Sequence, residues 1–199
     1  MQALLKASAA NHHGHVTFDY AQTTHPSYNA LVPVMGNIAA RPGLCTALCM
    51  TWLIGWRETN PRAFAESAES NLGQQSIIAY TNMICQVAAN WRGATNNIMQ
   101  QQQFVGAVDQ ALHPANVLNL SAAVAAHRYT ILVGYGAGAD SHAVAVLRAG
   151  QACSFFDPNE GELHFKTIAD FAAWFFEALN GFQSLCFPNY NFIWRLQYD

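Results

Sequence analysis

The spacing of apolar residues divides the chain into a helical part and a later part rich in β-strands. Leucine or tryptophan recurs at every fourth position from Leu44 to Trp56, which is the spacing of one face of an α-helix. We therefore predict a helix over residues 44–57, ended by the polar run before Pro61. The pattern over residues 96–112 also predicts a helix, which ends before Pro114.

After Arg128 the apolar residues occur in short runs of β-branched and aromatic side chains, separated by turn residues such as glycine. Runs of this kind predict β-strands. We place the strands at residues 129–135, 142–148, 152–156, 162–165 and 191–198. A further helix is predicted over residues 167–180, between the last two strands. Helices that precede mostly antiparallel strands indicate an α+β fold, in which the helix over 44–57 packs against a sheet of about four to five strands.

The same pattern separates an N-terminal segment from the rest of the chain. The first 30 residues show no clear period, so we expect residues 1–30 to form a loose or peripheral segment. Residues 31–199 are enough for one compact domain with its own core.

Composition and charge exclude several kinds of partner. Hydrophobic residues make up 52% of the chain and charged residues 11%, which favours a packed globule over a disordered chain. The net charge is -3 and no basic run is present, so nucleic acid is not an expected partner. The most apolar stretch, residues 43–56, is shorter than the roughly 20 residues that span a bilayer, and no integral membrane segment is expected. The N-terminal residues lack the long apolar region of a cleavable signal peptide.

The cysteines and histidines do not predict a metal site or a cofactor. The chain has five cysteines and no Cys-x-x-Cys pair, so we expect neither a disulfide framework nor a structural zinc site. His12, His13 and His15 are close enough in sequence to share a transition metal ion. A terminal cluster of this kind is more often simply solvated, and that is the interpretation we adopt.

Cys45 has the position of a nucleophile. It lies in the first turn of the helix predicted over residues 44–57, directly after Pro42 and Gly43. Free backbone N–H groups and the helix dipole stabilise a thiolate at this place, and the backbone N–H of Cys45 could also stabilise an oxyanion. The alternative is a core thiol, because free cysteines are among the most buried residues.

His142 and Asp157 have the chemistry of a base and of the acid that orients it. His142 opens a predicted strand after a glycine-rich loop, and Asp157 ends the next strand before Pro158 and Asn159. If these strands pair as a hairpin, the carboxylate can hold the imidazole ring in position. Each residue also has a structural alternative: a histidine at a strand edge, and an Asp-Pro-Asn turn. The order Cys, His, Asp, with the cysteine on an early helix, favours a catalytic triad.

Three segments around these residues resemble the YopT/AvrPphB family of cysteine proteases, which are bacterial effectors. The segments are Gly43-Leu44-Cys45-Thr46-Ala47-Leu48-Cys49-Met50-Thr51-Trp52-Leu53, Ser141-His142-Ala143-Val144-Ala145 and Phe155-Phe156-Asp157-Pro158-Asn159-Glu160-Gly161-Glu162. The corresponding family patterns resemble Gly-x-Cys-x-Ala-Leu-Ser-x-x-Trp, His-Ala-x-Ala and Phe-Asp-Pro-Asn-x-Gly. The resemblance implies a papain-like fold over residues 31–199, with Cys45, His142 and Asp157 as the catalytic triad.

The chain departs from the family pattern at two places. Cys49 stands where the family usually has Ser, and no Asn or Gln lies immediately before Cys45. Asn37, eight residues before Cys45, is the nearest upstream amide that could act as a second oxyanion donor. It could equally form a turn with Gly36.

The expected function is cleavage of a specific protein substrate through an acyl-thioenzyme formed on Cys45. A glutamine deamidase or a transglutaminase would use the same triad and the same intermediate, so both alternatives stay open. A non-catalytic binding module on the same fold is the alternative from another class. The resemblance further implies a monomeric virulence effector, secreted by a bacterium into a host cell, whose substrate is a host signalling protein.

Overall fold

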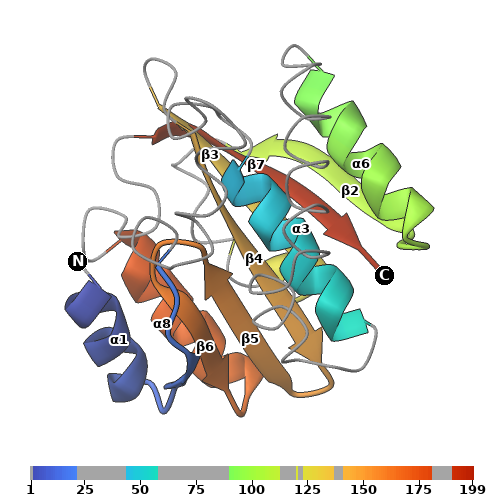
Figure 1. The fold of residues 1–199 in the computed structure, drawn as a ribbon. Helices are drawn as coiled ribbons and strands as arrows, with labels where there is room; N and C mark the ends of the chain where they lie inside the picture. The colour runs from blue at the N-terminus through green and yellow to red at the C-terminus, as the bar shows by residue number, and fades with distance from the viewer. Residues whose placement is uncertain are drawn as a thin grey trace.

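The computed structural model describes residues 2–21, 44–57, 90–112, 120, 123–136, 141–180 and 190–199. The helices and strands are α1 (Gln2–Asn11), β1 (His15–Phe18), α3 (Leu44–Arg57), α6 (Trp91–Gln101), β2 (Gly106–Leu112), β3 (Tyr129–Gly136), β4 (Ser141–Ala149), β5 (Ala152–Asp157), β6 (Gly161–Phe165), α8 (Ile168–Asn180) and β7 (Tyr190–Tyr198). Figure 1 shows α3 on one face of the sheet and α8 on the other. Within these residues no helix is both long and apolar enough to cross a membrane.

A single antiparallel sheet organises the described part of the chain. Its strands lie in the order β1-β6-β5-β4-β3-β7-β2, and every neighbouring pair is antiparallel. The predicted α+β class is confirmed, but the sheet has seven strands instead of the four to five that we predicted. The two strands that the prediction missed, β1 and β2, form the two edges of the sheet.

The prediction of one helix over residues 96–112 is wrong in its second half. The helix α6 is capped by Asn90, whose side chain accepts a hydrogen bond from the backbone N–H of Gly93, and it ends at Gln101. Gln103 then adopts a φ of 64°, a left-handed conformation that a right-handed helix does not continue through. Residues 106–112 pair with β7. This segment has little apolar patterning of its own, and pairing with a distant strand decides its conformation.

The five strands predicted after Arg128 are all present, each within one residue of its predicted bounds. The register of β4 and β5 determines where the site residues lie. Ala145 pairs with Phe156 and Ala149 pairs with Ala152, next to a tight turn in which Gly150 has a φ of 65°. The start of β4 and the end of β5 therefore meet at the same end of the sheet.

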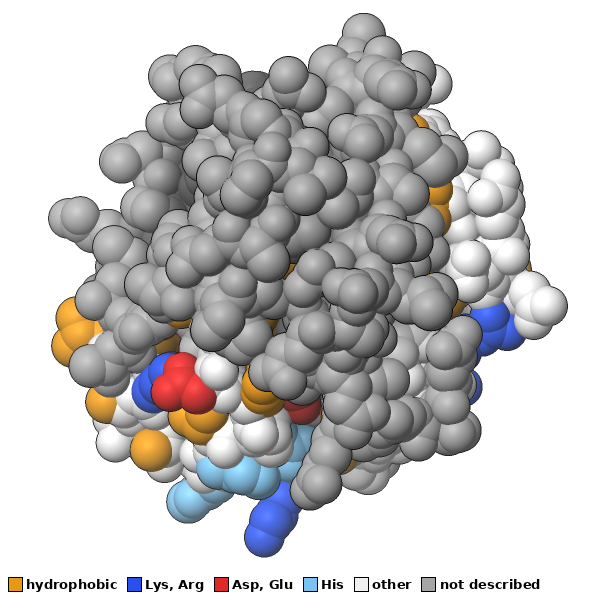
Figure 2. All heavy atoms as spheres, in the orientation of Figure 1, with side chains coloured by type: hydrophobic (Ala, Val, Ile, Leu, Met, Phe, Trp, Pro, Cys, Tyr) orange, Lys and Arg blue, Asp and Glu red, His pale blue; other side chains and the backbone are white. Residues whose placement is uncertain are grey.

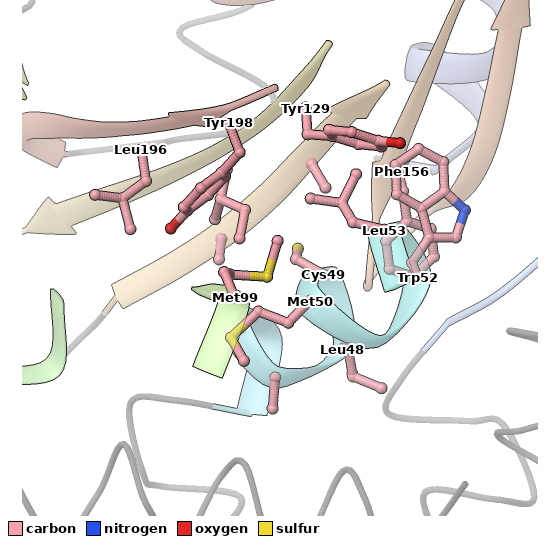
Figure 3. Packing of buried hydrophobic residues seen from close by; sticks show 14 of the residues in the cluster. Leu48, Cys49, Met50, Trp52, Leu53, Met99, Tyr129, Phe156, Leu196 and Tyr198 are labelled. Atoms are coloured by element: carbon pink, nitrogen blue, oxygen red, sulfur yellow. The ribbon is translucent and has the colours of Figure 1, made fainter. Parts of the chain in front are cut away.

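The helix α3 covers one face of the sheet with its apolar stripe. Alternate residues of the central strands, among them Ala143, Ala145 and Phe156, belong to the cluster that it contacts. The ring of Trp52 stacks on Phe156 with 5.4 Å between ring centroids and 17° between planes, as Figure 3 shows. Burial of this face stabilises the helix where its sequence period predicts it.

The helices α8 and α1 cover the opposite face. Strand residues that alternate with those facing α3, including Val144 and Phe155, belong to this second cluster. Trp174 of α8 is fully buried, with its ring centroid 4.9 Å from those of both Phe155 and Phe165. The first helix contributes Leu5, which is also buried.

The N-terminal segment takes part in the fold over the residues that are described. Residues 2–21 form α1 and the edge strand β1, which pairs with β6. Leu5 and Tyr20 are each 1% exposed, so both ends of this stretch contribute to the cores. The boundary that we placed after residue 30 lies outside the described residues, and the division into segment and domain stays a prediction.

Candidate active site

Cys45 lies in the first turn of α3, the position that its sequence context predicts. Its side chain is partly exposed, whereas Cys49 and Cys153 are buried. Partial exposure suits a nucleophile that a substrate must reach. The positive end of the helix dipole lies at this same end of α3.

His142 and Asp157 are brought together by the pairing of β4 with β5. His142 follows the first residue of β4, and Asp157 is the last residue of β5. The Nε2 atom of His142 lies 2.9 Å from Oδ1 of Asp157, which is hydrogen-bonding distance. Both side chains are buried, with exposed fractions of 8% and 2%. The two residues expected to act as base and acid are therefore in direct contact.

The turn after β5 also holds Asp157 in place through two backbone N–H groups. The backbone N–H of Asn159 donates a hydrogen bond to Oδ1 of Asp157 at 2.8 Å, and the backbone N–H of Glu160 donates to the Asp157 carbonyl at 3.0 Å. Asp157 thus forms the turn that its sequence suggests and contacts His142 through the same oxygen. The two interpretations of Asp157 are compatible.

The pKa of His142 is raised well above its usual value. Burial by itself lowers this pKa, because it disfavours the charged ring. The charge of Asp157, the charge of Cys45 and a hydrogen bond with each of them raise it, and together they outweigh burial. Asp157 contacts Nε2 of the ring, Cys45 is close enough to His142 to raise its pKa, and the imidazolium form of His142 is favoured.

The other described cysteines are poorer nucleophiles than Cys45. Burial, followed by the charges of Cys45 and Asp157, raises the pKa of Cys49 well above its usual value. Burial raises the pKa of Cys153 to about 11. A thiol of raised pKa holds its proton at neutral pH, so neither residue competes with Cys45 for the role of thiolate.

The sequence did not predict a role for two acidic residues near the site, Glu160 and Glu162. Burial and the neighbouring Asp157 carboxylate raise the pKa of Glu160 to about 7. Glu162 is 5% exposed and contacts α3, as described below. A charged residue inside a short apolar strand was the available signal for Glu162, because such a residue is seldom fully buried without a partner.

The N-terminal histidines singled out in the sequence have other partners than the proposed triad. Asn37, the candidate oxyanion donor, lies outside the described residues. His12 pairs with Glu177 of α8 at 2.5 Å, and the ring of His15 lies edge-on to that of His164, with 5.3 Å between centroids. Figure 2 shows histidine side chains gathered on the surface near α1 and β1. In the part of the chain that is described, no group of three or more His, Cys, Asp or Glu is placed to hold a metal ion.

Comparisons with known proteins identify the family and the fold of this chain. Residues 6–185 match the model of a peptidase family described as Yersinia/Haemophilus virulence surface antigen. No curated protein matches the chain. The solved structure of the Pseudomonas avirulence protein AvrPphB matches with a TM-score of 0.62 at 16% identity, over 78% of this chain and 91% of that chain.

Two further solved structures match with lower TM-scores. The YopT domain of the Pasteurella multocida PfhB2 toxin has a TM-score of 0.37 at 21% identity, over 86% of this chain and 88% of that chain. PatoxP, a cysteine protease-like domain of the Photorhabdus asymbiotica toxin PaTox, has a TM-score of 0.41 at 14% identity, over 98% of this chain and 57% of that chain. The likeness to AvrPphB supports the papain-like α+β fold, and the family match spans most of the sequence. The chain therefore belongs to the Yersinia/Haemophilus virulence surface antigen family of YopT-type cysteine peptidases.

Proposed function

We propose that this protein is an active cysteine protease whose catalytic triad is Cys45, His142 and Asp157. One observation carries the proposal: a partly exposed thiol in the first turn of α3, an imidazole and a buried carboxylate follow one another in hydrogen-bonding order. A thiol and an imidazole in contact form a thiolate–imidazolium pair, which is the activated form of a cysteine nucleophile.

The reaction follows from this pair. The Cys45 thiolate attacks the carbonyl carbon of the scissile peptide bond, and the carbonyl oxygen becomes an oxyanion. As the oxyanion collapses, the C–N bond breaks and the leaving amine takes the proton of His142. A water molecule then gives a proton to His142 and attacks the acyl-thioenzyme, which releases the acid and restores the thiolate. Asp157 holds the ring of His142 and stabilises its charged form throughout.

The developing oxyanion requires hydrogen-bond donors. The backbone N–H of Cys45 belongs to the first turn of α3, and N–H groups at a helix N-terminus favour negative charge. Removing one such donor from a cysteine or serine hydrolase lowers kcat by about a hundredfold or more. We propose this N–H as the first donor and retain Asn37 as a candidate for the second.

The biological setting is part of the proposal. The family description refers to virulence, and AvrPphB is described as an avirulence protein. We propose that the chain is a bacterial effector delivered into a host cell, where it acts as a monomer on a specific host protein. The sequence features that argue against nucleic acid as a partner, a net charge of -3 and no basic run, agree with a protein substrate.

The proposal is tested by incubating host-cell extract with the protein and with Cys45→Ala, and mapping new protein N-termini by mass spectrometry. The proposal expects a small set of N-termini that the active protein generates and Cys45→Ala does not. Uncut substrates that gain the mass of deamidation, or that become cross-linked, would instead favour a deamidase or a transglutaminase. A folded protein that changes no substrate and whose Cys45 does not react with alkylators would favour a binding module.

A further inference from the structure

Glu162 of β6 is a charged residue in an apolar place. It is 5% exposed and lies between the buried residues Gly161 and Leu163 at the start of the strand. A carboxylate removed from water loses several kcal/mol of hydration unless other groups satisfy its oxygens. The partners of Glu162 therefore indicate why an acidic residue is tolerated there.

Each carboxylate oxygen of Glu162 accepts a hydrogen bond from a different element. The indole Nε1–H of Trp52, on α3, donates to Oε2 at 2.8 Å. The hydroxyl of Thr17, on β1, donates to Oε1 at 2.8 Å. Burial raises the pKa of Glu162, and the hydrogen bonds from Trp52 and Thr17 lower it. One side chain thus joins α3, β6 and the N-terminal edge strand.

Trp52 and Cys45 lie on the same helix, so their relative position is fixed. Trp52 lies seven residues after Cys45, which is two helical turns or about 10 Å along the axis, so both side chains lie on the same face of α3. A helix of this length transmits a shift or rotation at Trp52 to its first turn. The position of the Trp52 indole is thus one determinant of where the Cys45 sulfur lies.

On the sheet, Glu162 lies next to the strand pair that contains Asp157. Glu162 pairs across the strands with Phe156, and Asp157 pairs with Gly161. The ring of Trp52 stacks on Phe156 (Figure 3), so it contacts the residue next to Asp157 as well as Glu162. A side chain at Gly161 would collide with the backbone of Phe18, which shows how closely the N-terminal strand crosses this turn.

We propose that Glu162 is a positioning residue that sets the nucleophile on α3 relative to the His142–Asp157 pair on the sheet. Apolar contacts between a helix and a sheet are not directional, whereas a hydrogen bond weakens when its donor moves or turns. The carboxylate therefore fixes how far α3 slides and rotates over the β5–β6 hairpin. This inference rests on the proposed triad, because the triad gives the relative position of the two elements its chemical consequence.

The test measures the rate at which iodoacetamide alkylates Cys45 in the full-length protein, followed by peptide mass spectrometry, at about pH 6 and about pH 9. An ordinary thiol with a pKa of about 8.5 is almost unreactive at the lower pH, so reaction there reports the thiolate–imidazolium pair. Three variants probe the link: Glu162→Leu removes both acceptors, Glu162→Gln keeps one acceptor for Trp52 and can donate to Thr17, and Glu162→Leu with Trp52→Phe removes the acceptor and its buried donor together.

The positioning role predicts a specific pattern among these variants. Glu162→Leu and the double variant lose about tenfold in the rate at low pH, because displacements of about 1 Å at an active site have effects of this size or larger. The rate at high pH stays near that of the unmodified protein, and Glu162→Gln stays within about twofold at both pH values. The double variant removes the Trp52 donor together with its acceptor, so if Glu162 served only to satisfy the Trp52 indole, this variant would recover the full rate at low pH.

A matched control separates positioning from loss of stability. Gln197 is also buried and bonds to Ala123 and Thr130 through its side-chain amide, away from α3. Gln197→Met is expected to lower stability while the rate of Cys45 alkylation at low pH in the folded protein stays unchanged.

Different results overturn the two proposals. A folded double variant with an unchanged rate at low pH, or a control that loses as much rate as Glu162→Leu, overturns the positioning role while the triad stands. Alkylation of the unmodified protein that is slow at low pH and identical to that of His142→Ala overturns the triad, and the positioning role with it.

Discussion

Two fully buried tryptophans, one on each side of the sheet, differ in how they are held. Trp174 of α8 packs against the rings of Phe155 and Phe165, and its indole N–H has no hydrogen-bond partner among the described residues. Trp52 of α3 stacks on Phe156 (Figure 3) and also donates its N–H to Glu162. Trp174 is therefore held by apolar packing, and Trp52 by packing together with a directional polar contact.

The buried charged side chains are concentrated around the proposed site. Among the Asp, Glu, His, Lys and Arg residues that the structure describes, those with buried side chains are His142, Asp157 and Glu162. Two of these form the proposed triad with Cys45, and the third contacts the helix that carries Cys45. Buried charges reduce stability unless they are paired, so their concentration around the proposed site indicates that this region is organised for chemistry as well as for stability.

The largest expected effect comes from removing Trp174, which is held by apolar packing. Trp174→Ala should lower the free energy of unfolding by about 3–5 kcal/mol, because a buried ring is replaced by a cavity. Urea unfolding measures this loss. The alkylation rate of Cys45 in the molecules that remain folded should not change. A loss of stability below about 1 kcal/mol would contradict the described burial of Trp174.

A smaller and more selective effect compares the two tryptophans directly. Trp52→Phe and Trp174→Phe remove the same atoms, so their volume effects are similar. Trp52→Phe also leaves one oxygen of Glu162 without its buried donor, which costs about 1–3 kcal/mol. Trp52→Phe should therefore be the more destabilising variant by about that amount in parallel urea titrations. Equal losses would show that the bond between Trp52 and Glu162 contributes nothing net to stability.

The pH dependence of stability gives the smallest expected effect. The folded state raises the pKa of His142 above its unfolded value of 6.5, so it favours the imidazolium. The stabilisation that this provides is fully present below pH 6.5 and is lost as pH rises through the raised pKa, by up to about 1.4 kcal/mol per pH unit. The difference in unfolding free energy between the unmodified protein and His142→Ala should shrink over that range. A difference that grows with pH would contradict a raised pKa.

Local patterns predicted the elements that bury an apolar face of their own. The helical stripe from Leu44 to Trp56 and the strands after Arg128 agree with the structure almost residue by residue. The edge strands were missed because β1 and β2 are short or weakly apolar and gain their conformation from pairing with β6 and β7. No local pattern encodes such a distant partner.

The contacts within the candidate site also depend on residues that are distant in sequence. The chain order of Cys45, His142 and Asp157 suggested a common function, but only the register of β4 with β5 brings the last two within 2.9 Å. Glu162 was missed because its partner Trp52 lies 110 residues away in sequence. Asn37 lies outside the described residues, so its role as an oxyanion donor remains a proposal.

The most direct test of the triad is the pH dependence of Cys45 alkylation in the unmodified protein, His142→Ala and Asp157→Asn. A thiolate–imidazolium pair keeps Cys45 reactive toward iodoacetamide at about pH 6, where an ordinary thiol is mostly protonated. The account predicts that His142→Ala loses this reactivity at low pH, that Asp157→Asn weakens it, and that all three proteins react at similar rates near pH 9. A reactivity of Cys45 at low pH that is the same in the unmodified protein and His142→Ala would contradict the proposed mechanism.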